Sequence, residues 1–288
     1  MKHESSATGI EHVGIIGGGR MGAGIAQVFA TLGSNVTVAE SADQRAALGR
    51  VADGLARAHR LGKLGDMNPQ AVLGRVSTVG APDALPPELD LVVEAVPEQI
   101  DLKLGVLALV EKSVSPTTVI ATNTSSISIA ALAAGLTNPT RLVGMHFFNP
   151  VPASALVEIV RGPATDHHVL EKVRKWVSRL GKTDVLVNDS PGFATSRLGV
   201  CLALEAIRML EEGVADAETI DRAMELGYRH PMGPLRSTDL VGLDVRLAIA
   251  EQLETSLGER FAPPALLREK VARGELGRKI GRGFYTWS

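Results

Sequence analysis

The sequence contains almost no cysteine and no long apolar run. Its single cysteine, Cys201, excludes an intrachain disulfide and a cysteine-based zinc site. The His and carboxylate residues show no HExxH or similar spacing, so no metal site is expected. The longest apolar stretches, such as Val106–Val110, are far shorter than the roughly 20 residues of a membrane helix. The polar segment Met1–Thr8 has no apolar core of signal-peptide length, so a reducing cytoplasm is the expected location.

Charge of neither sign is in excess. The 288 residues include 30 basic and 32 acidic side chains, which leave a net charge of -2. This balance gives no bulk attraction to nucleic acid or to an anionic membrane, and neither is expected as a partner. Apolar residues make up 45% and charged residues 22%, which is typical of a globular chain, and the length indicates about two domains.

The first two thirds of the chain alternate short β-rich runs with helix-length segments such as Met21–Leu32 and Ser41–Arg60. The predicted strands are His12–Ile16, Asn35–Ala39, Leu89–Glu94, Thr118–Ala121, Leu142–Phe147, Leu156–Val160 and Asp184–Val187. Several of these runs lack polar alternation, as expected for parallel strands covered on both faces. Strands that alternate with helices predict βαβ units and a mainly parallel sheet.

From residue 189 onward the pattern becomes helical. Ser190 can cap a helix that starts at Pro191, and apolar residues then follow at helical spacing: Leu198, Leu202, Leu204, Ile207 and Leu210. Further helical patterns cover Asp239–Leu257 and Pro264–Arg273. We therefore predict an α/β domain over residues 1–188 and an all-helical domain over residues 189–288. The first helix is apolar enough to predict a homodimer through this domain, with Cys201 as a small buried residue.

A glycine-rich turn follows the first predicted strand. Gly17, Gly18, Gly19, Arg20, Met21 and Gly22 fit the pattern GxGxxG, and an apolar helix follows. The first glycine permits a tight turn, the second lets a pyrophosphate approach the backbone, and the third lets the helix lie close to the strand. The helix N-terminus would supply N–H groups to the phosphates. The turn predicts a dinucleotide-binding domain of the Rossmann type.

Glu40 completes this motif at the end of the second predicted strand, 18 residues beyond Gly22. Its carboxylate can accept hydrogen bonds from the ribose hydroxyls of an adenosine and would repel a 2′-phosphate, so NAD is favoured over NADP. The alternative interpretation is an ordinary glycine turn followed by an exposed glutamate.

One histidine is placed for acid–base chemistry. His146 lies near the end of the apolar strand 142–147, and ligands of open α/β sheets bind beyond the carboxyl ends of the strands. Glu158 lies 12 residues further on, inside the apolar run 156–160, where an unpaired carboxylate is costly. We predict that the two pair, so that the carboxylate orients the imidazole. The alternatives are a core histidine with other partners and a glutamate on a solvent-facing side.

Six motifs in this order resemble the short 3-hydroxyacyl-CoA dehydrogenases, in particular the bacterial 3-hydroxybutyryl-CoA dehydrogenases. They are GIIGGGRMGAGIA, TNTSSISI, MHFFNPVPASALVEIV, NDSPGFATSRL, HPMGPLRSTDLVGLD and GRKIGRGFYTW, and the match runs from Ile10 onward. The resemblance implies an N-terminal NAD domain and a helical C-terminal domain that forms the dimer. It also implies NAD-dependent oxidation of a short-chain (S)-3-hydroxyacyl-CoA to the 3-oxoacyl-CoA, and the reverse reduction.

The resemblance further implies roles for individual residues. His146 matches the catalytic base and Glu158 its paired acid, while Ser125 matches a serine that contacts the substrate's 3-oxygen and the nicotinamide side. Lys63 matches a lysine at the CoA phosphates. Contacts with the cofactor are implied for Glu98, Lys103, Asn149 and Lys279. Simpler interpretations are that Ser125 and Ser126 cap the next helix, that the lysines are solvated, and that Glu98 is a first-turn acid.

Ser196 departs from the family pattern, which has asparagine at this position near the base. Serine is shorter but still offers a donor and an acceptor, so Ser196 could act on the substrate through a water, or Thr195 could contribute. Because of this departure, a second hypothesis is an NAD-dependent dehydrogenase of a free 3-hydroxy acid or a sugar acid such as L-gulonate. Arg197 and Arg236 could then hold the free carboxylate. A third hypothesis is a cofactor-binding protein without turnover.

Overall fold

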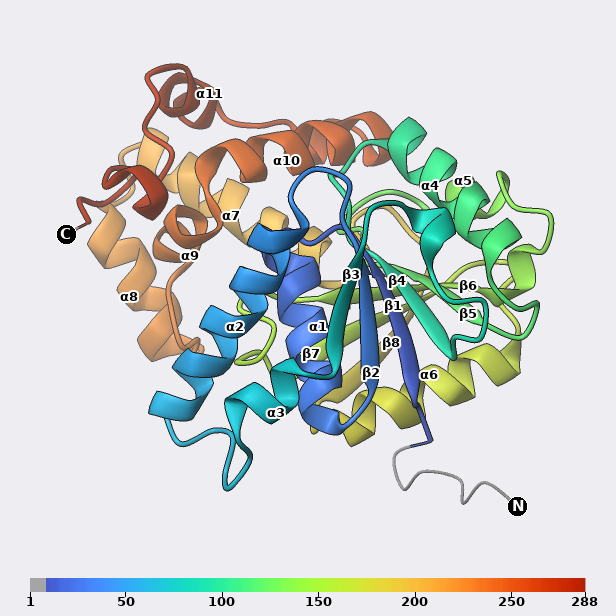
Figure 1. The fold of residues 1–288 in the computed structure, drawn as a ribbon. Helices are drawn as coiled ribbons and strands as arrows, with labels where there is room; N and C mark the ends of the chain where they lie inside the picture. Colours follow the sequence, from blue (N-terminus) through green and yellow to red (C-terminus); the bar gives the residue numbers. More distant parts are fainter. Residues whose placement is uncertain (1–8, 288) are drawn as a thin grey trace, which may run out of the picture. The chain divides into compact units, whose positions relative to one another are not determined.

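The computed structural model describes residues 9–287, so the polar segment Met1–Thr8 lies outside the described part. Contacts along the chain divide it into two compact units, of which the first ends at Asp189 and the second begins at Ser190 (Figure 1). Within residues 9–287, no helix is both long and apolar enough to cross a membrane.

The first unit is built on one eight-stranded sheet with the strand order β3-β2-β1-β4-β5-β6-β7-β8. The strands are β1 (His12–Ile16), β2 (Asn35–Ala39), β3 (Val76–Val79), β4 (Leu91–Glu94), β5 (Val119–Thr122), β6 (Leu142–Phe147), β7 (Leu156–Arg161) and β8 (Thr183–Asn188). Strands β1 to β6 are parallel, β7 is antiparallel to β6, and β8 is parallel to β7. The predicted fold class, a mainly parallel sheet followed by helices, is confirmed.

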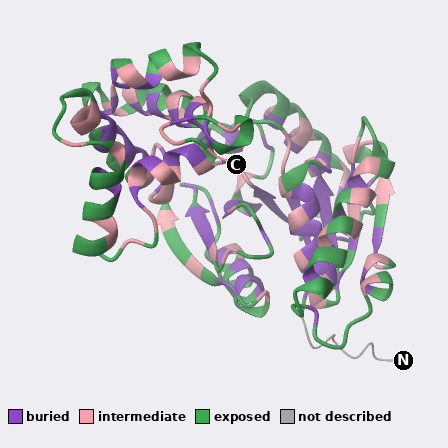
Figure 2. Cartoon of the chain, turned by 90° about the vertical axis from the view of Figure 1, so that its left-hand side faces the viewer, coloured by how far each residue is buried: buried purple, intermediate pink, exposed green. Residues whose placement is uncertain are grey.

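Helices follow the strands of this unit. They are α1 (Arg20–Leu32), α2 (Gln44–Arg60), α3 (Pro69–Leu73), α4 (Ile100–Ser113), α5 (Ile129–Ala133) and α6 (His167–Arg179). The central strands β4, β5 and β6 are buried along their whole length (Figure 2). The sequence patterns missed β3, an edge strand. Its sequence Val-Ser-Thr-Val is short and only partly buried, so it lacks the apolar run that marks the central strands.

The second unit is helical, with α7 (Thr195–Glu211), α8 (Ala217–Gly227), α9 (Pro234–Val241), α10 (Leu243–Leu257) and α11 (Ala265–Ala272). The helix predicted from Pro191 begins only at Thr195, because Gly192 and Phe193 take left-handed conformations with φ of 72° and 52°. The helix predicted over Asp239–Leu257 is two helices, since Gly242 has a φ of 107° that no α-helix accommodates.

The predicted burial of Cys201 is wrong, because this residue is exposed. The buried face of α7 consists of Val200, Ala203, Leu204, Ala206 and Ile207. Cys201 is rotated by about 100° from its neighbour Val200. It lies on the side of Leu198 and Leu202, which are 65% and 42% exposed. This side of α7 is therefore apolar but not used for the core of its own unit.

Candidate active site

The glycine turn after β1 has the geometry of a pyrophosphate site. Gly17 has a φ of 92°, and a Cβ on Gly22 would lie 1.8 Å from the carbonyl oxygen of Gly17. A Cβ on Gly19 would meet nothing within 4 Å, so the backbone of Gly19 faces open space. Gly19 precedes α1 without a side-chain cap, which leaves the N–H groups of the first turn, at Arg20 and Met21, suited to an anion. These residues fit the phosphates of a dinucleotide.

Glu40 lies beside this turn, directly after β2. Its Oε2 accepts a hydrogen bond from Gly18 N at 2.9 Å, and its Oε1 accepts one from Ala42 N at 2.8 Å. The hydrogen bond from Ala42 lowers the pKa of Glu40 most, and that from Gly18 adds to it, against a smaller rise from burial. Glu40 is therefore ionised at neutral pH and retains lone pairs for the hydroxyls of a ribose.

Removal of this charge is expected to weaken the cofactor preference. In the Glu40→Gln protein, the ratio of kcat/KM for NADH to that for NADPH should fall about 10- to 100-fold, because a 2′-phosphate is no longer repelled and one charged acceptor is lost. Initial rates with both cofactors measure this ratio. The exposed Glu88, changed to Gln, is the control that should leave it unaltered. An unchanged ratio in Glu40→Gln would place the ribose elsewhere.

A buried ion pair connects the end of β4 with α4. Glu94 is fully buried and Lys103 is 1% exposed. The ammonium of Lys103 donates to Glu94 Oε1 at 2.7 Å and to the carbonyl of Val96 at 3.2 Å, and lies 3.3 Å from Glu98 Oε2. All three of its N–H groups thus face protein oxygens. Lys103 is not the solvated lysine of the simpler interpretation.

Glu98 in turn fixes the loop after β5. Its Oε1 accepts from the hydroxyl of Thr124 at 2.6 Å and from both N–H and hydroxyl groups of Ser125 and Ser126, at 2.9 to 3.3 Å. Burial raises the pKa of Glu98, but the charge of Lys103 and these hydrogen bonds outweigh it, so the pKa is lowered overall. The cap of α5 is Ser128, so neither Ser125 nor Ser126 is the capping residue. The carboxylate instead holds the serine loop in place.

His146 and Glu158 are brought together by the antiparallel pairing of β6 and β7. They lie directly opposite each other in the register, and His146 Nδ1 is 3.1 Å from Glu158 Oε2. His146 is 8% exposed and Glu158 is fully buried, and the ring of Phe148 lies 4.3 Å from that of His146. A buried carboxylate that faces one imidazole nitrogen orients the ring for proton exchange at the other.

The remaining predicted residues lie at several places in the two units. Asn149 is exposed directly after β6, and Lys63 is exposed after α2, where it borders a pocket that α1 also lines. Ser196 lies half-buried in the first turn of α7. In the same unit, Lys279 Nζ pairs with Asp244 at 2.6 Å. Lys279 thus has an acidic partner, whereas Asn149 and Lys63 are exposed.

Of the two arginines that could hold the carboxylate of a free acid, Arg236 already stacks on two aromatic rings. Its guanidinium lies 4.3 Å from the ring centre of Tyr285 and 5.6 Å from that of Trp287. Both aromatic residues are themselves tied down, since Tyr285 OH donates to Asp221 and Trp287 Nε1 donates to Asp239, each at 2.7 Å. Arg236 therefore belongs to the packing of the C-terminal segment. Arg197 is half-buried on α7.

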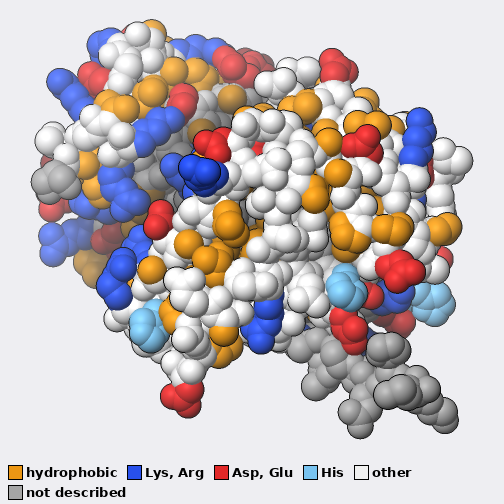
Figure 3. Space-filling model, viewed as in Figure 1, with side chains coloured by type: hydrophobic (Ala, Val, Ile, Leu, Met, Phe, Trp, Pro, Cys, Tyr) orange, Lys and Arg blue, Asp and Glu red, His pale blue; other side chains and the backbone are white. Residues whose placement is uncertain are grey.

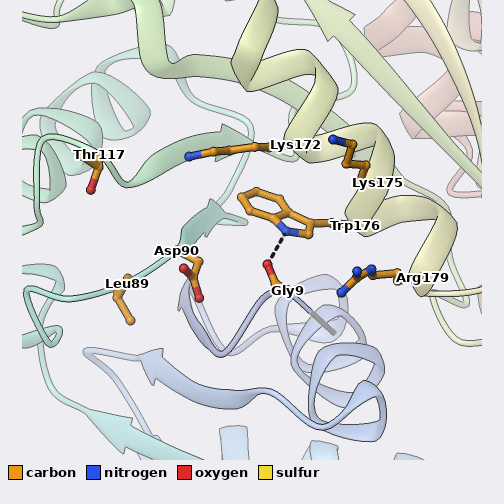
Figure 4. A pocket seen from close by; sticks show the side chains of 8 residues that line it. All are labelled: Gly9, Leu89, Asp90, Thr117, Lys172, Lys175, Trp176 and Arg179. Atoms are coloured by element: carbon orange, nitrogen blue, oxygen red, sulfur yellow. Dashed lines mark hydrogen bonds between the residues drawn. The ribbon is translucent and has the colours of Figure 1, made fainter. Parts of the chain in front are cut away.

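A separate pocket lies at the other end of the sheet. It is lined by Gly9, Leu89, Asp90, Thr117, Lys172, Lys175, Trp176 and Arg179 (Figure 4). Four of its lining residues precede β1, β4 or β5, the other four lie on α6, and Trp176 Nε1 donates to Gly9 O at 3.0 Å. His146 stands at the opposite, carboxyl end of β6, so this pocket is not part of the candidate active site. In the described part of the chain no three His, Cys, Asp or Glu side chains form a metal-binding group.

Two features of the site escaped the sequence patterns. Glu94 ends a fully apolar strand, the same signal that pointed to Glu158, but its partner Lys103 lies on a helix rather than on a neighbouring strand. Asn123 accepts a hydrogen bond from Phe147 N at 2.8 Å and so ties the end of β5 to β6. No residue spacing in the sequence predicts a hydrogen bond of this kind between two strand ends.

Comparison with known proteins places this geometry in a family. Residues 12–190 match the NAD binding domain of 3-hydroxyacyl-CoA dehydrogenase, and residues 192–287 match its C-terminal domain. The chain belongs to the 3-hydroxyacyl-CoA dehydrogenase family. A probable 3-hydroxybutyryl-CoA dehydrogenase of Deinococcus radiodurans is 43% identical over 278 residues, 95% of this chain and 99% of that protein. A 3-hydroxybutyryl-CoA dehydrogenase of Mycobacterium tuberculosis is 42% identical over 96% of this chain and 99% of its own length.

A solved structure supports the same family assignment. The crystal structure of an (S)-3-hydroxybutyryl-CoA dehydrogenase from Ralstonia eutropha is 42% identical, with a TM-score of 0.91 over 97% of this chain and 99% of that one. As a member of the 3-hydroxyacyl-CoA dehydrogenase family, the chain is an oxidoreductase whose first unit is an NAD-binding domain. The glycine turn and Glu40 are where that domain would hold the cofactor.

Proposed function

We propose that this protein oxidises short-chain (S)-3-hydroxyacyl-CoA, such as 3-hydroxybutyryl-CoA, to the 3-oxoacyl-CoA with NAD, and catalyses the reverse reduction. The His146–Glu158 pair carries the proposal, because it puts a buried, oriented imidazole at the carboxyl end of β6 within an NAD-binding unit. The names of relatives that share about two fifths of their residues with this chain support the same substrate class.

In the proposed reaction His146 takes the proton of the substrate's 3-hydroxyl at Nε2, since Nδ1 faces Glu158. NAD, which the glycine turn and Glu40 would hold, would supply the acceptor for the hydride that leaves C3. Glu158 stabilises the imidazolium that forms, and its burial keeps that attraction strong. In the reverse direction the same imidazolium returns its proton to the 3-oxygen.

Other residues position the substrate and the cofactor and do not transfer protons. Ser125 holds the 3-oxygen, in a loop that Glu98 fixes, and Lys103 acts on that loop through Glu98. We assign the remaining contacts by the family pattern: Asn149 and Lys279 to the cofactor, Lys63 to the CoA phosphates, and Ser196 to the substrate. The alternative substrate, a free hydroxy acid or sugar acid, is less favoured because Arg236 is already stacked on two aromatic rings.

Reduction of acetoacetyl-CoA tests the proposal. Purified protein is expected to oxidise NADH rapidly in the presence of acetoacetyl-CoA, as followed by absorbance, because the proposed acid–base pair would give a proton to the 3-oxygen. Free acetoacetate and NADPH, run beside it, should react much more slowly. NADH binding without oxidation by the thioester would contradict the proposed function, and faster turnover of the free acid would favour the alternative.

We also propose that the protein is a homodimer and that it is located in the cytoplasm. Exposed Leu198 and Leu202 support a homodimer through the helical unit, because a contiguous apolar helix side favours association. Acidic and basic side chains are interspersed on the face shown in Figure 3, which fits a small-molecule enzyme rather than a nucleic-acid-binding protein.

A further inference from the structure

Three cations of α6 line the pocket at the amino ends of the strands (Figure 4). Lys172, Lys175 and Arg179 are three and four residues apart, so they share one side of the helix. All three are exposed, and none has a hydrogen bond or an ion pair with another residue of the described chain, 9–287. Like charges at these spacings repel each other. An anion in the pocket would remove this repulsion.

A glycine holds Arg179 at the pocket. Gly9 has a φ of 62°, and a Cβ on this residue would lie 2.8 Å from Nη1 and 3.3 Å from Cζ of Arg179. The carbonyl of Gly9 accepts the hydrogen bond from Trp176 Nε1 at 3.0 Å, which fixes the segment before β1 against α6. A side chain at position 9 would displace the guanidinium, so the glycine keeps this charge beside the pocket.

The pocket contains one acid, on the side opposite α6. Asp90 Oδ2 accepts hydrogen bonds from the N–H groups of Glu11 and His12 at 2.7 and 3.0 Å, whereas its Oδ1 has no partner among residues 9–287. The three cations exceed this acid by two positive charges, so the lining favours an anion. The pocket lies at the opposite end of the sheet from His146, so its ligand is not the substrate of the proposed reaction.

We propose that this pocket binds a pyrophosphate group, either free or as part of a nucleoside diphosphate. Lys172 and Arg179 are seven residues apart, about 10 Å along the helix. Two linked phosphates can meet cations toward both ends of this row, and a guanidinium binds phosphate through two parallel hydrogen bonds. A single phosphate reaches fewer of the three cations. The volume of about 260 Å³ lies below the roughly 300–1,000 Å³ of pockets for drug-sized ligands, so a whole dinucleotide is not expected here.

Calorimetric titration of the whole protein with inorganic pyrophosphate tests the inference. NADH is present in excess so that the glycine turn is filled, and the ionic strength is held constant because salt screens exposed charges. The unaltered protein should bind pyrophosphate with a Kd below about 1 mM, and orthophosphate about 10-fold more weakly. Lys172→Gln and Lys175→Gln should each weaken pyrophosphate binding about 3- to 10-fold. The control is Arg174→Gln, which removes an equal charge from another side of α6 and should change the affinity by less than about twofold.

The substitution Asp90→Asn is expected to have the opposite effect. The amide oxygen can still accept from the N–H groups of Glu11 and His12, but the negative charge is gone. Pyrophosphate should therefore bind about 2- to 5-fold more tightly. A purely structural role of Asp90 would not increase the affinity.

ADP, titrated in place of pyrophosphate, identifies the source of the group. Equal affinities for the two would assign the site to the diphosphate alone. Tighter binding of ADP would assign it to a nucleotide whose ribose hydroxyl donates to Asp90 Oδ1.

Three results overturn the inference. They are equal affinities for orthophosphate and pyrophosphate, no binding of pyrophosphate below about 1 mM, and unchanged binding in both Lys172→Gln and Lys175→Gln. Loss of binding in Lys63→Gln with full retention in Lys172→Gln would also overturn it, because the anion would then lie in the other pocket that Arg179 lines, beside Lys63. The two lysines of α6, which line only the proposed site of these two pockets, therefore decide.

Discussion

Replacement of His146 by glutamine is expected to lower kcat for acetoacetyl-CoA reduction about 100- to 10,000-fold. Glutamine is polar and of similar reach, but it cannot exchange a proton near neutral pH. Glu158 lies 3.1 Å from the imidazole of His146 and is fully buried, which orients the ring for the proposed proton transfer. Steady-state kinetics with NADH give kcat, and NADH binding measured by fluorescence titration should stay within about twofold of the unaltered protein.

The control is His59→Gln, at an exposed position of α2, which should leave kcat unchanged. Glu158→Gln should also lower kcat, and the double variant with His146→Gln should be no slower than His146→Gln alone, because the carboxylate acts through the imidazole. Additive losses would mean that Glu158 serves another purpose. A His146→Gln protein that keeps more than about one tenth of its kcat would remove the histidine from the chemistry.

The sequence predicts the central strands and the acid–base pair for the same physical reason. Apolar runs without polar alternation mark strands buried on both faces, and a carboxylate within such a run needs a partner. Glu158 follows this rule, and the antiparallel turn after β6 brings it opposite His146. Glu94 follows it too, but its partner Lys103 comes from a helix that packs over the strand end. Predicting that contact requires the packing of helix on sheet, which local patterns do not contain.

Local sequence patterns do not predict backbone conformations or burial that depend on tertiary contacts. Phe193 adopts a φ of 52°, a region that local propensity assigns to glycine, and this delays the start of α7. Cys201 belongs to an apolar helix, but which side of the helix is buried depends on α9 and α10 and not on its own period. Arg246 is the clearest case, since arginine predicts an exposed position and the structure buries it against Gly199.

Loss of the Lys103 charge is expected to destabilise the first unit strongly. In the Lys103→Met protein the free energy of unfolding should fall by about 3–5 kcal/mol, because fully buried Glu94 keeps its carboxylate but loses the ammonium 2.7 Å away. The aliphatic part of the side chain is nearly preserved, so the loss reports the charge rather than a cavity. Urea unfolding followed by circular dichroism measures the change.

The matched control lies on the same helix. Lys112→Met, at an exposed position of α4, should alter the free energy of unfolding by less than about 0.5 kcal/mol. The double variant Glu94→Gln/Lys103→Met removes both charges and should recover most of the loss, since a neutral buried pair has no unpaired ion to stabilise. If the double variant regains its stability but binds NADH much more weakly than Glu94→Gln alone, Lys103 contacts the cofactor directly. If its NADH affinity matches that of Glu94→Gln, Lys103 acts through the strand end and Glu98, as the three oxygens around its ammonium indicate.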